Sequence, residues 1–227
     1  AKGGHNLESH NHNDVGSFIV FANGRPLFVD LGTEEYKSQT FGPDRYELWY
    51  LQSQYHNLPT VGGVLQQAGR TFAARDASYR CDDAAAVLSL DIAAAYPAEA
   101  GIARWTRTVA LHRGGDGAGR TAGSRVEVTE DYELRGENGD ILYSWMTPCR
   151  PAEGAEPGTL VLPYAEGRAA VLTYDAAVLA PVVETIELAD ARLRGNWGER
   201  MYRIALREKA PVARGRRTFA VTLREEG

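Results

Sequence analysis

The fold class is indicated by two apolar runs around one turn, Ser17-Phe18-Ile19-Val20-Phe21-Ala22-Asn23-Gly24-Arg25-Pro26-Leu27-Phe28-Val29-Asp30-Leu31. The dipeptide Asn23-Gly24 is a strong signal for a two-residue hairpin loop, because a type I′ turn needs positive φ at both central residues. The flanking runs have the length and apolar content of strands. Residues 17–31 therefore predict an antiparallel β-hairpin.

The register of this hairpin determines where Asp30 lies. A two-residue loop pairs Ala22 with Arg25, and continued pairing places Ser17 opposite Asp30. An acidic residue at the end of an apolar strand is costly to bury unless it is solvated or coordinated. The hairpin is therefore expected to bring a carboxylate to the end of the strand that follows His12.

Three of the five histidines lie close to this hairpin or to a second turn. Two of them occur in the run His10-Asn11-His12-Asn13-Asp14, and the third is His56, which precedes Asn57. Imidazole and carboxylate are the ligand types that zinc takes in a site without thiolates. The cluster therefore indicates a metal site, whereas Asn11, Asn13 and Asn57 are expected to form local turns through side-chain to backbone bonds and not to act as catalysts.

The composition bounds the class of protein. The chain has 227 residues, of which 44% are apolar, enough for a sizeable core in one large all-β domain or two small ones. A formal charge of −5 argues against a nucleic-acid-binding protein. The absence of an apolar run of about 18 residues argues against a membrane span. The chain opens on Ala1-Lys2-Gly3-Gly4 without a signal peptide, as expected for a piece of a longer protein.

Strand-like runs recur along the rest of the chain, separated by Gly-rich turn clusters. We predict strands at residues 70–75, 84–93, 102–113, 124–134, 141–146, 159–163, 169–174, 181–188, 200–207 and 217–223. The pattern predicts an all-β fold, a large antiparallel β-sandwich of roughly a dozen or more strands. One short helix is expected at residues 43–54, and a mobile loop at residues 114–123. Cys81 and Cys149 are expected to be two unpaired, buried thiols.

Several motifs resemble the C-terminal β-sandwich domain of heparinase II/III-type polysaccharide lyases. They are Gly3-Gly4-His5-Asn6, Ser9-His10-Asn11-His12-Asn13-Asp14-Val15-Gly16-Ser17-Phe18, Phe28-Val29-Asp30-Leu31-Gly32, His56-Asn57-Leu58-Pro59-Thr60-Val61 and Trp105-Thr106-Arg107. The match is dense between residues 3 and 61, and the remainder agrees in strand content.

The resemblance implies an organisation and a reaction. Residues 1–227 would form one β-sandwich domain, preceded in the complete enzyme by an α/α toroid that this chain lacks. Such lyases cleave acidic polysaccharides by β-elimination beside a uronic acid. The toroid supplies the catalytic tyrosine, so the isolated chain is expected to be inactive. The resemblance also suggests a periplasmic or secreted protein.

The same resemblance assigns roles to individual residues. His12, Asp30 and His56 match the zinc ligands of the family, and the zinc is structural. His10 matches a histidine that reaches the substrate cleft, where it helps to neutralise the uronate carboxylate or to handle its proton. Both tasks fit β-elimination, in which charge develops on the carboxylate and a proton moves.

Two other functions fit parts of the sequence. His12, Asp14 and His56 satisfy the two-histidine, one-carboxylate triad of non-haem iron oxygenases. The discriminating feature is the carboxylate that joins the histidines, Asp14 for the oxygenase and Asp30 for the lyase. A non-catalytic carbohydrate-binding sandwich is the third possibility, with a sugar-stacking platform formed by Trp49, Trp105, Trp145 and Trp197, although core packing is the more common fate of tryptophan.

Overall fold

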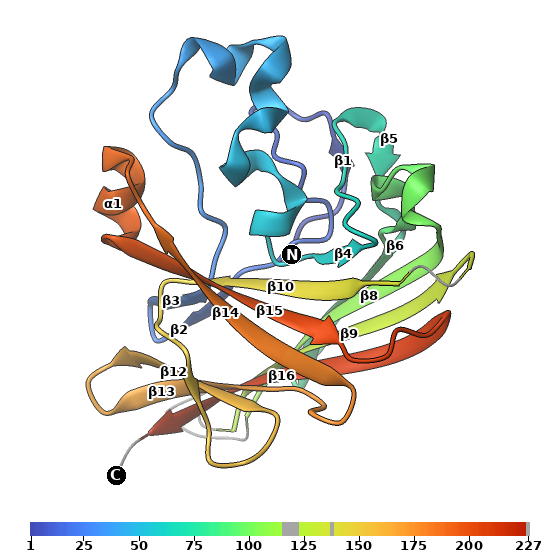
Figure 1. Ribbon diagram of the computed structural model, residues 1–227. Coiled ribbons are helices and arrows are strands. Elements are labelled where there is room, and N and C mark those ends of the chain that lie inside the picture. Colours follow the sequence, from blue (N-terminus) through green and yellow to red (C-terminus); the bar gives the residue numbers. More distant parts are fainter. Residues whose placement is uncertain (115–122, 137–138, 226–227) are drawn as a thin grey trace.

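The strands of this chain pair in antiparallel fashion. The computed structural model describes residues 1–114, 123–136 and 139–225. The larger sheet has eight strands in the order β11-β12-β13-β16-β9-β8-β7-β6 (Figure 1). Their bounds are Ala152–Glu153 (β11), Thr159–Ala165 (β12), Arg168–Thr173 (β13), Arg214–Glu225 (β16), Arg125–Leu134 (β9), Ile102–His112 (β8), Ala85–Asp91 (β7) and Arg75–Cys81 (β6).

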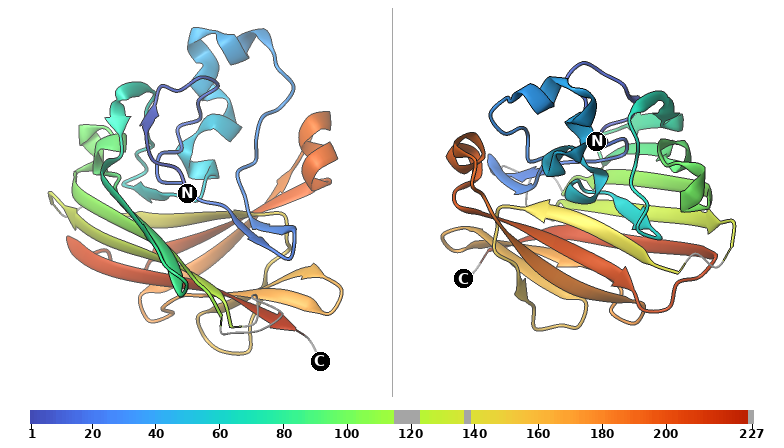
Figure 2. Two further views of the ribbon diagram at one scale, coloured as in Figure 1. Left: turned by 180° about the vertical axis from the view of Figure 1, so that it is seen from behind. Right: turned by 45° about the horizontal axis from the view of Figure 1, so that its top comes forward.

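A second antiparallel sheet has four strands in the order β14-β15-β10-β4. Their bounds are Leu179–Glu187 (β14), Arg200–Glu208 (β15), Ile141–Thr147 (β10) and Pro59–Val61 (β4). Two small pairs complete the strands, β1 (His5–Asn6) with β5 (Gly69–Ala73) and β2 (Val20–Ala22) with β3 (Arg25–Phe28). The predicted all-β sandwich of a dozen or more strands is therefore confirmed. Figure 2 shows the N-terminal segment and its helical turns lying together on one side of the sheets.

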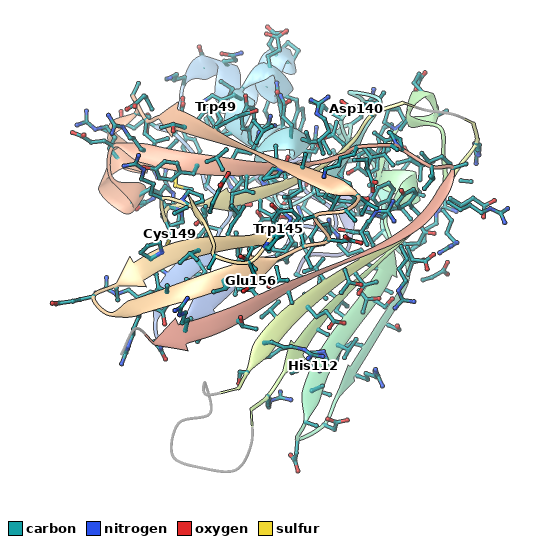
Figure 3. The ribbon with its side chains drawn as sticks, turned by 60° about the horizontal axis from the view of Figure 1, so that its bottom comes forward. Trp49, His112, Asp140, Trp145, Cys149 and Glu156 are labelled. Atoms are coloured by element: carbon teal, nitrogen blue, oxygen red, sulfur yellow. The ribbon has the colours of Figure 1, made fainter. Side chains whose placement is uncertain are left out.

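The core lies between the two large sheets and also holds the N-terminal segment in place. Trp145 on β10 lies in the middle of the molecule, whereas His112 lies at the far end of β8 (Figure 3). The ring centroid of Trp145 is 4.9 Å from that of Phe18 and 4.8 Å from that of Phe28. Burial of an aromatic side chain removes about 150–250 Å² of surface from contact with water. These contacts therefore fix the hairpin, and with it Asp30, against the sheets.

The hairpin forms at the predicted turn, with a different register. Asn23 and Gly24 both have positive φ, 51° and 74°, as a type I′ turn requires. Ala22 pairs with Arg25 as predicted, but the ladder shifts by one residue at a bulge and ends with Val20 opposite Phe28. The predicted pairing of Ser17 with Asp30 is therefore wrong, and the strands are shorter than the apolar runs.

The helix predicted at residues 43–54 is wrong. The segment instead forms consecutive 3₁₀ turns, because Leu48 and Gln52 have extended backbone, with ψ of 119° and 140°. The described part of the chain contains the 3₁₀ helices Ser38–Phe41 (η1), Pro43–Glu47 (η2), Trp49–Leu51 (η3), Ser53–Tyr55 (η4), Ala93–Ala95 (η5) and Ala98–Ala100 (η6). A short α-helix is present elsewhere, at Ala191–Trp197 (α1), where the Asp190 carboxylate accepts hydrogen bonds from the backbone of Arg192 and Leu193.

The expectations for the cysteines, the loop at residues 114–123 and a membrane span compare with the structure as follows. Both cysteines are free as predicted, but only Cys149 is buried, and Cys81 is exposed on β6. The loop expected at residues 114–123 falls mostly outside the described residues. Within the described ranges, no helix combines the length and the apolar content needed to cross a membrane.

Candidate metal centre

Three side chains predicted as metal ligands converge on one point. His12 lies in the N-terminal segment, Asp30 follows β3, and His56 follows η4. Nδ1 of His56 lies 3.1 Å from Oδ2 of Asp30, and Nδ1 of His12 lies 3.9 Å from Oδ1 of Asp30. One ligand atom from each residue lies within 4.8 Å of the others. The two histidines are buried, and Asp30 is partly exposed.

The spacing and chemistry of these atoms suit a tetrahedral zinc ion. Zinc–nitrogen and zinc–oxygen bonds of about 2.0–2.2 Å place neighbouring ligand atoms about 3.3–3.6 Å apart in a tetrahedron. Nδ1 of His12 and both ring nitrogens of His56 are buried and form no hydrogen bond with the described residues, although Nδ1 of His56 lies 3.1 Å from Oδ2 of Asp30. Unpartnered buried polar atoms are costly. A cation would satisfy the nitrogens that face Asp30.

The pKa shifts in the cluster favour the metal-binding protonation states of His12 and Asp30. Burial lowers the pKa of His12 to about 4, although Asp30 opposes the shift. Burial raises the pKa of Asp30, but His56 and His12 outweigh it and hold that pKa well below the usual range. For His56, burial lowers the pKa, but Asp30 outweighs it and the net shift is upward. At neutral pH His12 is therefore neutral and Asp30 ionised, the states in which these groups bind metals.

The alternative carboxylate, Asp14, has a different partner. Its Oδ1 accepts a hydrogen bond from Nζ of Lys2, which also lies 3.5 Å from Oδ1 of Asn11. Burial raises the pKa of Asp14, and His56 and Lys2 oppose that shift. The potential metal-binding group found among the described residues contains Asp30 and not Asp14.

His10 differs from His12 in its surroundings. It is exposed, and its ring stacks on that of Tyr36 with centroids 6.3 Å apart. Its φ of 57° is left-handed, so the backbone between the two histidines is not fully extended at this residue. The structure thus separates one buried histidine, beside Asp30, from one that faces solvent.

The tryptophans do not form an exposed platform. Trp105 and Trp145 are buried in the core. Trp49 is partly buried and donates through Nε1 to Oε1 of Glu34 at 2.9 Å. Trp197 is also partly buried and donates to the carbonyl oxygen of Leu31 at 2.9 Å. Core packing, the more common fate of tryptophan, therefore accounts for these side chains.

Asn57 has a larger role than the local turn expected from the sequence. Its buried side chain donates to the carbonyl oxygens of Phe18 and Val29 at 2.6 and 3.3 Å. Its Oδ1 accepts from the backbone N–H of Met146 at 2.6 Å. No local sequence pattern predicts these partners, because they come from three distant segments. Asn57 therefore ties the loop of His56 to the backbone just before Asp30.

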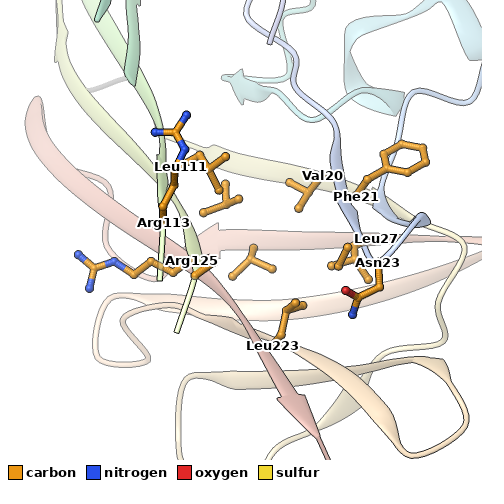
Figure 4. Close-up of a pocket in the computed structure, with 12 residues that line it drawn as sticks. Val20, Phe21, Asn23, Leu27, Leu111, Arg113, Arg125 and Leu223 are labelled. Carbon is orange, nitrogen blue, oxygen red and sulfur yellow. The ribbon is translucent and has the colours of Figure 1, made fainter. Parts of the chain in front are cut away.

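Two pockets lie near the hairpin. One, of about 270 Å³, is mainly apolar and lies between the β2–β3 hairpin and strands of the eight-stranded sheet, with the guanidinium groups of Arg113 and Arg125 directed away from it (Figure 4). None of the predicted site residues lines this pocket. A smaller opening of about 210 Å³ is lined by residues that include Lys2, Asp14 and Asp30. This second opening gives solvent access to the carboxylate of the cluster.

Solved structures share the fold of this chain. In structure, the chain is similar to a heparan sulfate lyase, HepC from Pedobacter heparinus, with a TM-score of 0.71 and 16% identity, covering 100% of this chain and 32% of that chain. It is also similar to the heparinase III-BT4657 gene product, with a TM-score of 0.66 and 15% identity, covering 98% and 31%. The chain thus spans about a third of the length of these structures, and at such identities the likeness shows the fold.

The family follows from the sequence itself. No curated protein sequence matches this chain. A family profile described as heparinase II/III-like, C-terminal, matches residues 1–119, which is more than half of the 227 residues. The chain therefore belongs to the heparinase II/III-like C-terminal family.

Proposed function

We propose that this chain is the β-sandwich portion of a polysaccharide lyase that cleaves uronic-acid-containing chains by β-elimination. The observation that supports the proposal most directly is the convergence of His12, Asp30 and His56 within 4.8 Å in a member of this family. The similar structures include a heparan sulfate lyase and heparinase III, which agrees with an acidic glycosaminoglycan as the substrate class.

The proposed organisation extends beyond the 227 residues. Residues 1–227 form one β-sandwich domain, and an N-terminal α/α toroid in the whole protein supplies the tyrosine that acts as acid and base. The similar structures are about three times as long as this chain, which leaves room for such a domain. An acidic polysaccharide outside the cell suits an exported protein, in the periplasm or secreted.

Zinc is the proposed metal, held by His12, Asp30 and His56. The unpartnered Nδ1 of His12, the unpartnered ring nitrogens of His56 and the ionised carboxylate of Asp30 support this choice of metal. A bound zinc would supply a fixed centre that ties together the N-terminal segment, the end of the hairpin and the loop after η4. β-Elimination adds no water, so the proposal needs no metal-activated hydroxide.

His10 is the proposed contact with the substrate. In β-elimination a base removes the proton from C5 of the uronate, the electron pair forms the C4–C5 double bond, and the C4–O bond breaks as the leaving oxygen is protonated. The C5 proton becomes acidic enough only when the neighbouring carboxylate is neutralised by a hydrogen bond or a positive charge. His10 is exposed and lies two residues before the buried His12 in the sequence, and an imidazole there can donate to that carboxylate.

The unsaturated product absorbs in the ultraviolet, which provides the test. The whole protein, incubated with heparan sulfate, hyaluronan and alginate in turn, should produce growing absorbance with at least one polymer. The 227-residue chain alone should produce none, because the acid and base belong to the toroid. If the whole protein yields no unsaturated product from any uronate polymer, the lyase proposal fails. Activity of the isolated chain would place every catalytic group within these residues.

A further inference from the structure

We propose that Arg107 is a positioning residue for the metal centre, acting from the eight-stranded sheet through the backbone beside the ligands. The inference rests on the proposed zinc site. Arg107 lies on β8, and its side chain is only 2% exposed. A guanidinium so deeply buried must have its donors satisfied. Its partners identify the segments that it holds.

One nitrogen of Arg107 contacts two loops. Nη1 donates to the carbonyl oxygen of Asn57 at 2.6 Å and to that of Gly16 at 2.8 Å. Asn57 directly follows His56 in sequence. Gly16 closes the segment that carries His12, where the backbone N–H of Ser17 returns to the carbonyl oxygen of Asp14 at 2.9 Å. Arg107 therefore fixes the positions of two ligand-bearing loops relative to the sheet and to each other.

The other donors of Arg107, Nε and Nη2, bind the carboxylate of Glu130, which also neutralises the charge of the guanidinium. Arg107 faces Glu130 across β8 and β9. Its Nε lies 3.0 Å from Oε1 of Glu130, and its Nη2 donates to the same oxygen. Nε1 of Trp105 donates to Oε2 of Glu130 at 2.7 Å, so both carboxylate oxygens are occupied. The paired charges therefore leave little net charge to repel a divalent cation.

The third ligand is reached through Asn57. Its side chain donates to the carbonyl oxygen of Val29, the residue before Asp30. A continuous set of hydrogen bonds thus runs from Glu130 through Arg107 and Asn57 to the backbone beside both His56 and Asp30. Residues that orient metal ligands in this way typically change metal affinity about 10–100-fold when they are removed.

A second arginine–glutamate pair, in which Glu208 is buried and Arg217 is partly exposed, offers a control. Arg217 on β16 donates through Nε and Nη2 to Oε1 and Oε2 of Glu208, at 2.6 and 2.8 Å. Glu208 is buried and also accepts from Tyr143 at 3.0 Å. Among the described residues, the side chains of this pair contact Tyr132, Tyr143 and the backbone of Arg216, and they contact neither Gly16, nor Asn57, nor a proposed ligand. Its removal should therefore alter stability without altering the metal centre.

The test compares zinc affinity in two double variants, Arg107→Met with Glu130→Gln and Arg217→Met with Glu208→Gln. Each replaces an ion pair without leaving an unpaired charge. Zinc affinity is measured by competition with a chromophoric chelator, and circular dichroism and thermal melting report the folded fraction. The Arg107 variant should bind zinc about 10–100-fold more weakly, whereas the Arg217 variant should stay within about twofold of the unchanged protein.

Arg107→Lys keeps the test decisive if the double variant does not fold. Lysine retains the charge beside Glu130 but lacks the planar fork that reaches the carboxylate and two carbonyls together, so zinc binding should still weaken. Unchanged zinc affinity in a folded Arg107 variant, or equal losses in both double variants, would overturn the inference while leaving the zinc site intact. Failure of the unchanged protein to bind zinc would instead overturn the metal site, and the inference with it.

Discussion

Nδ1 of His56 lies 3.1 Å from Oδ2 of Asp30, across the gap between the loop after η4 and the end of the β2–β3 hairpin. This approach joins two segments that the sequence keeps apart, and it identifies the carboxylate that accompanies the histidines. Asp14, the other candidate carboxylate, is paired with Lys2.

Replacing each carboxylate in turn tests that assignment. Asp30→Asn should weaken zinc binding by more than the roughly 10–100-fold that loss of an outer partner costs, because a ligand itself is removed. Asp14→Asn should retain zinc, since Asp14 lies outside the cluster. Metal content after dialysis and a chelator competition measure both. The reverse pattern would favour the oxygenase-type triad of His12, Asp14 and His56.

The two neighbouring histidines should separate metal binding from turnover. In the whole protein, His12→Ala should lose zinc and melt at a lower temperature, because a metal bound only to the folded state stabilises it. His10→Ala should keep both zinc and melting temperature but lower turnover by about 10²–10³-fold, as expected for loss of one hydrogen-bond donor to the charge that develops on the carboxylate. An exchange of these two phenotypes would mean that the roles of His10 and His12 are reversed.

Removal of the metal should lower stability reversibly. With zinc at about a thousand times its Kd, linkage contributes about 4 kcal/mol to the free energy of unfolding. Urea unfolding of chelator-treated protein should therefore show a lower midpoint, and one equivalent of zinc should restore it where magnesium does not. Identical unfolding curves before and after verified zinc removal would contradict this expectation.

Gly16 should not tolerate a side chain. Its φ is 93°, and a Cβ at this position would lie 2.8 Å from Cγ2 of Ile92. Gly16→Ala should therefore lower the free energy of unfolding by about 1–3 kcal/mol, measured by urea denaturation. Gly3→Ala is the matched control, because no atom lies within 4 Å of its added Cβ, and its effect should stay within about 0.5 kcal/mol. Equal effects of the two substitutions would refute the steric argument.

The strands that the sequence predicts well are those with one buried face. In β8 and β9 apolar side chains recur on the face that meets the core, and both were predicted within two residues. The strand β6 was missed because all seven of its residues are exposed and no apolar alternation marks it. The helix at residues 43–54 was misassigned because tertiary contacts decide its shape, including the hydrogen bond from the N–H of Asn13 to the carbonyl oxygen of Leu51.

In the candidate site, too, the sequence predicts some residues and not others. Residue types and motif spacing predict His12, Asp30 and His56 as metal ligands, because few residue types can bind a metal ion. The partners of Arg107 depend on strand register and on loops far away in sequence, which no local pattern records. One signal was present, because Arg107 lies two residues after the buried Trp105 and so shares its inward face. A buried arginine of this kind needs a carboxylate partner, but the sequence does not name Glu130.

The exposed strand β6 affects how the molecule meets its neighbours. It forms one edge of the eight-stranded sheet, where unpaired N–H and C=O groups can recruit a strand from another chain. Charged residues lie along it, including Arg75, Asp76 and Arg80, and its pairing with β7 is irregular between Arg75 and Ser78, where Asp76 has a φ of 50°. Charge and an irregular edge are both features that natural sheets use against aggregation. The strand without an apolar pattern thus gives this border of the sheet an edge that disfavours pairing with another strand.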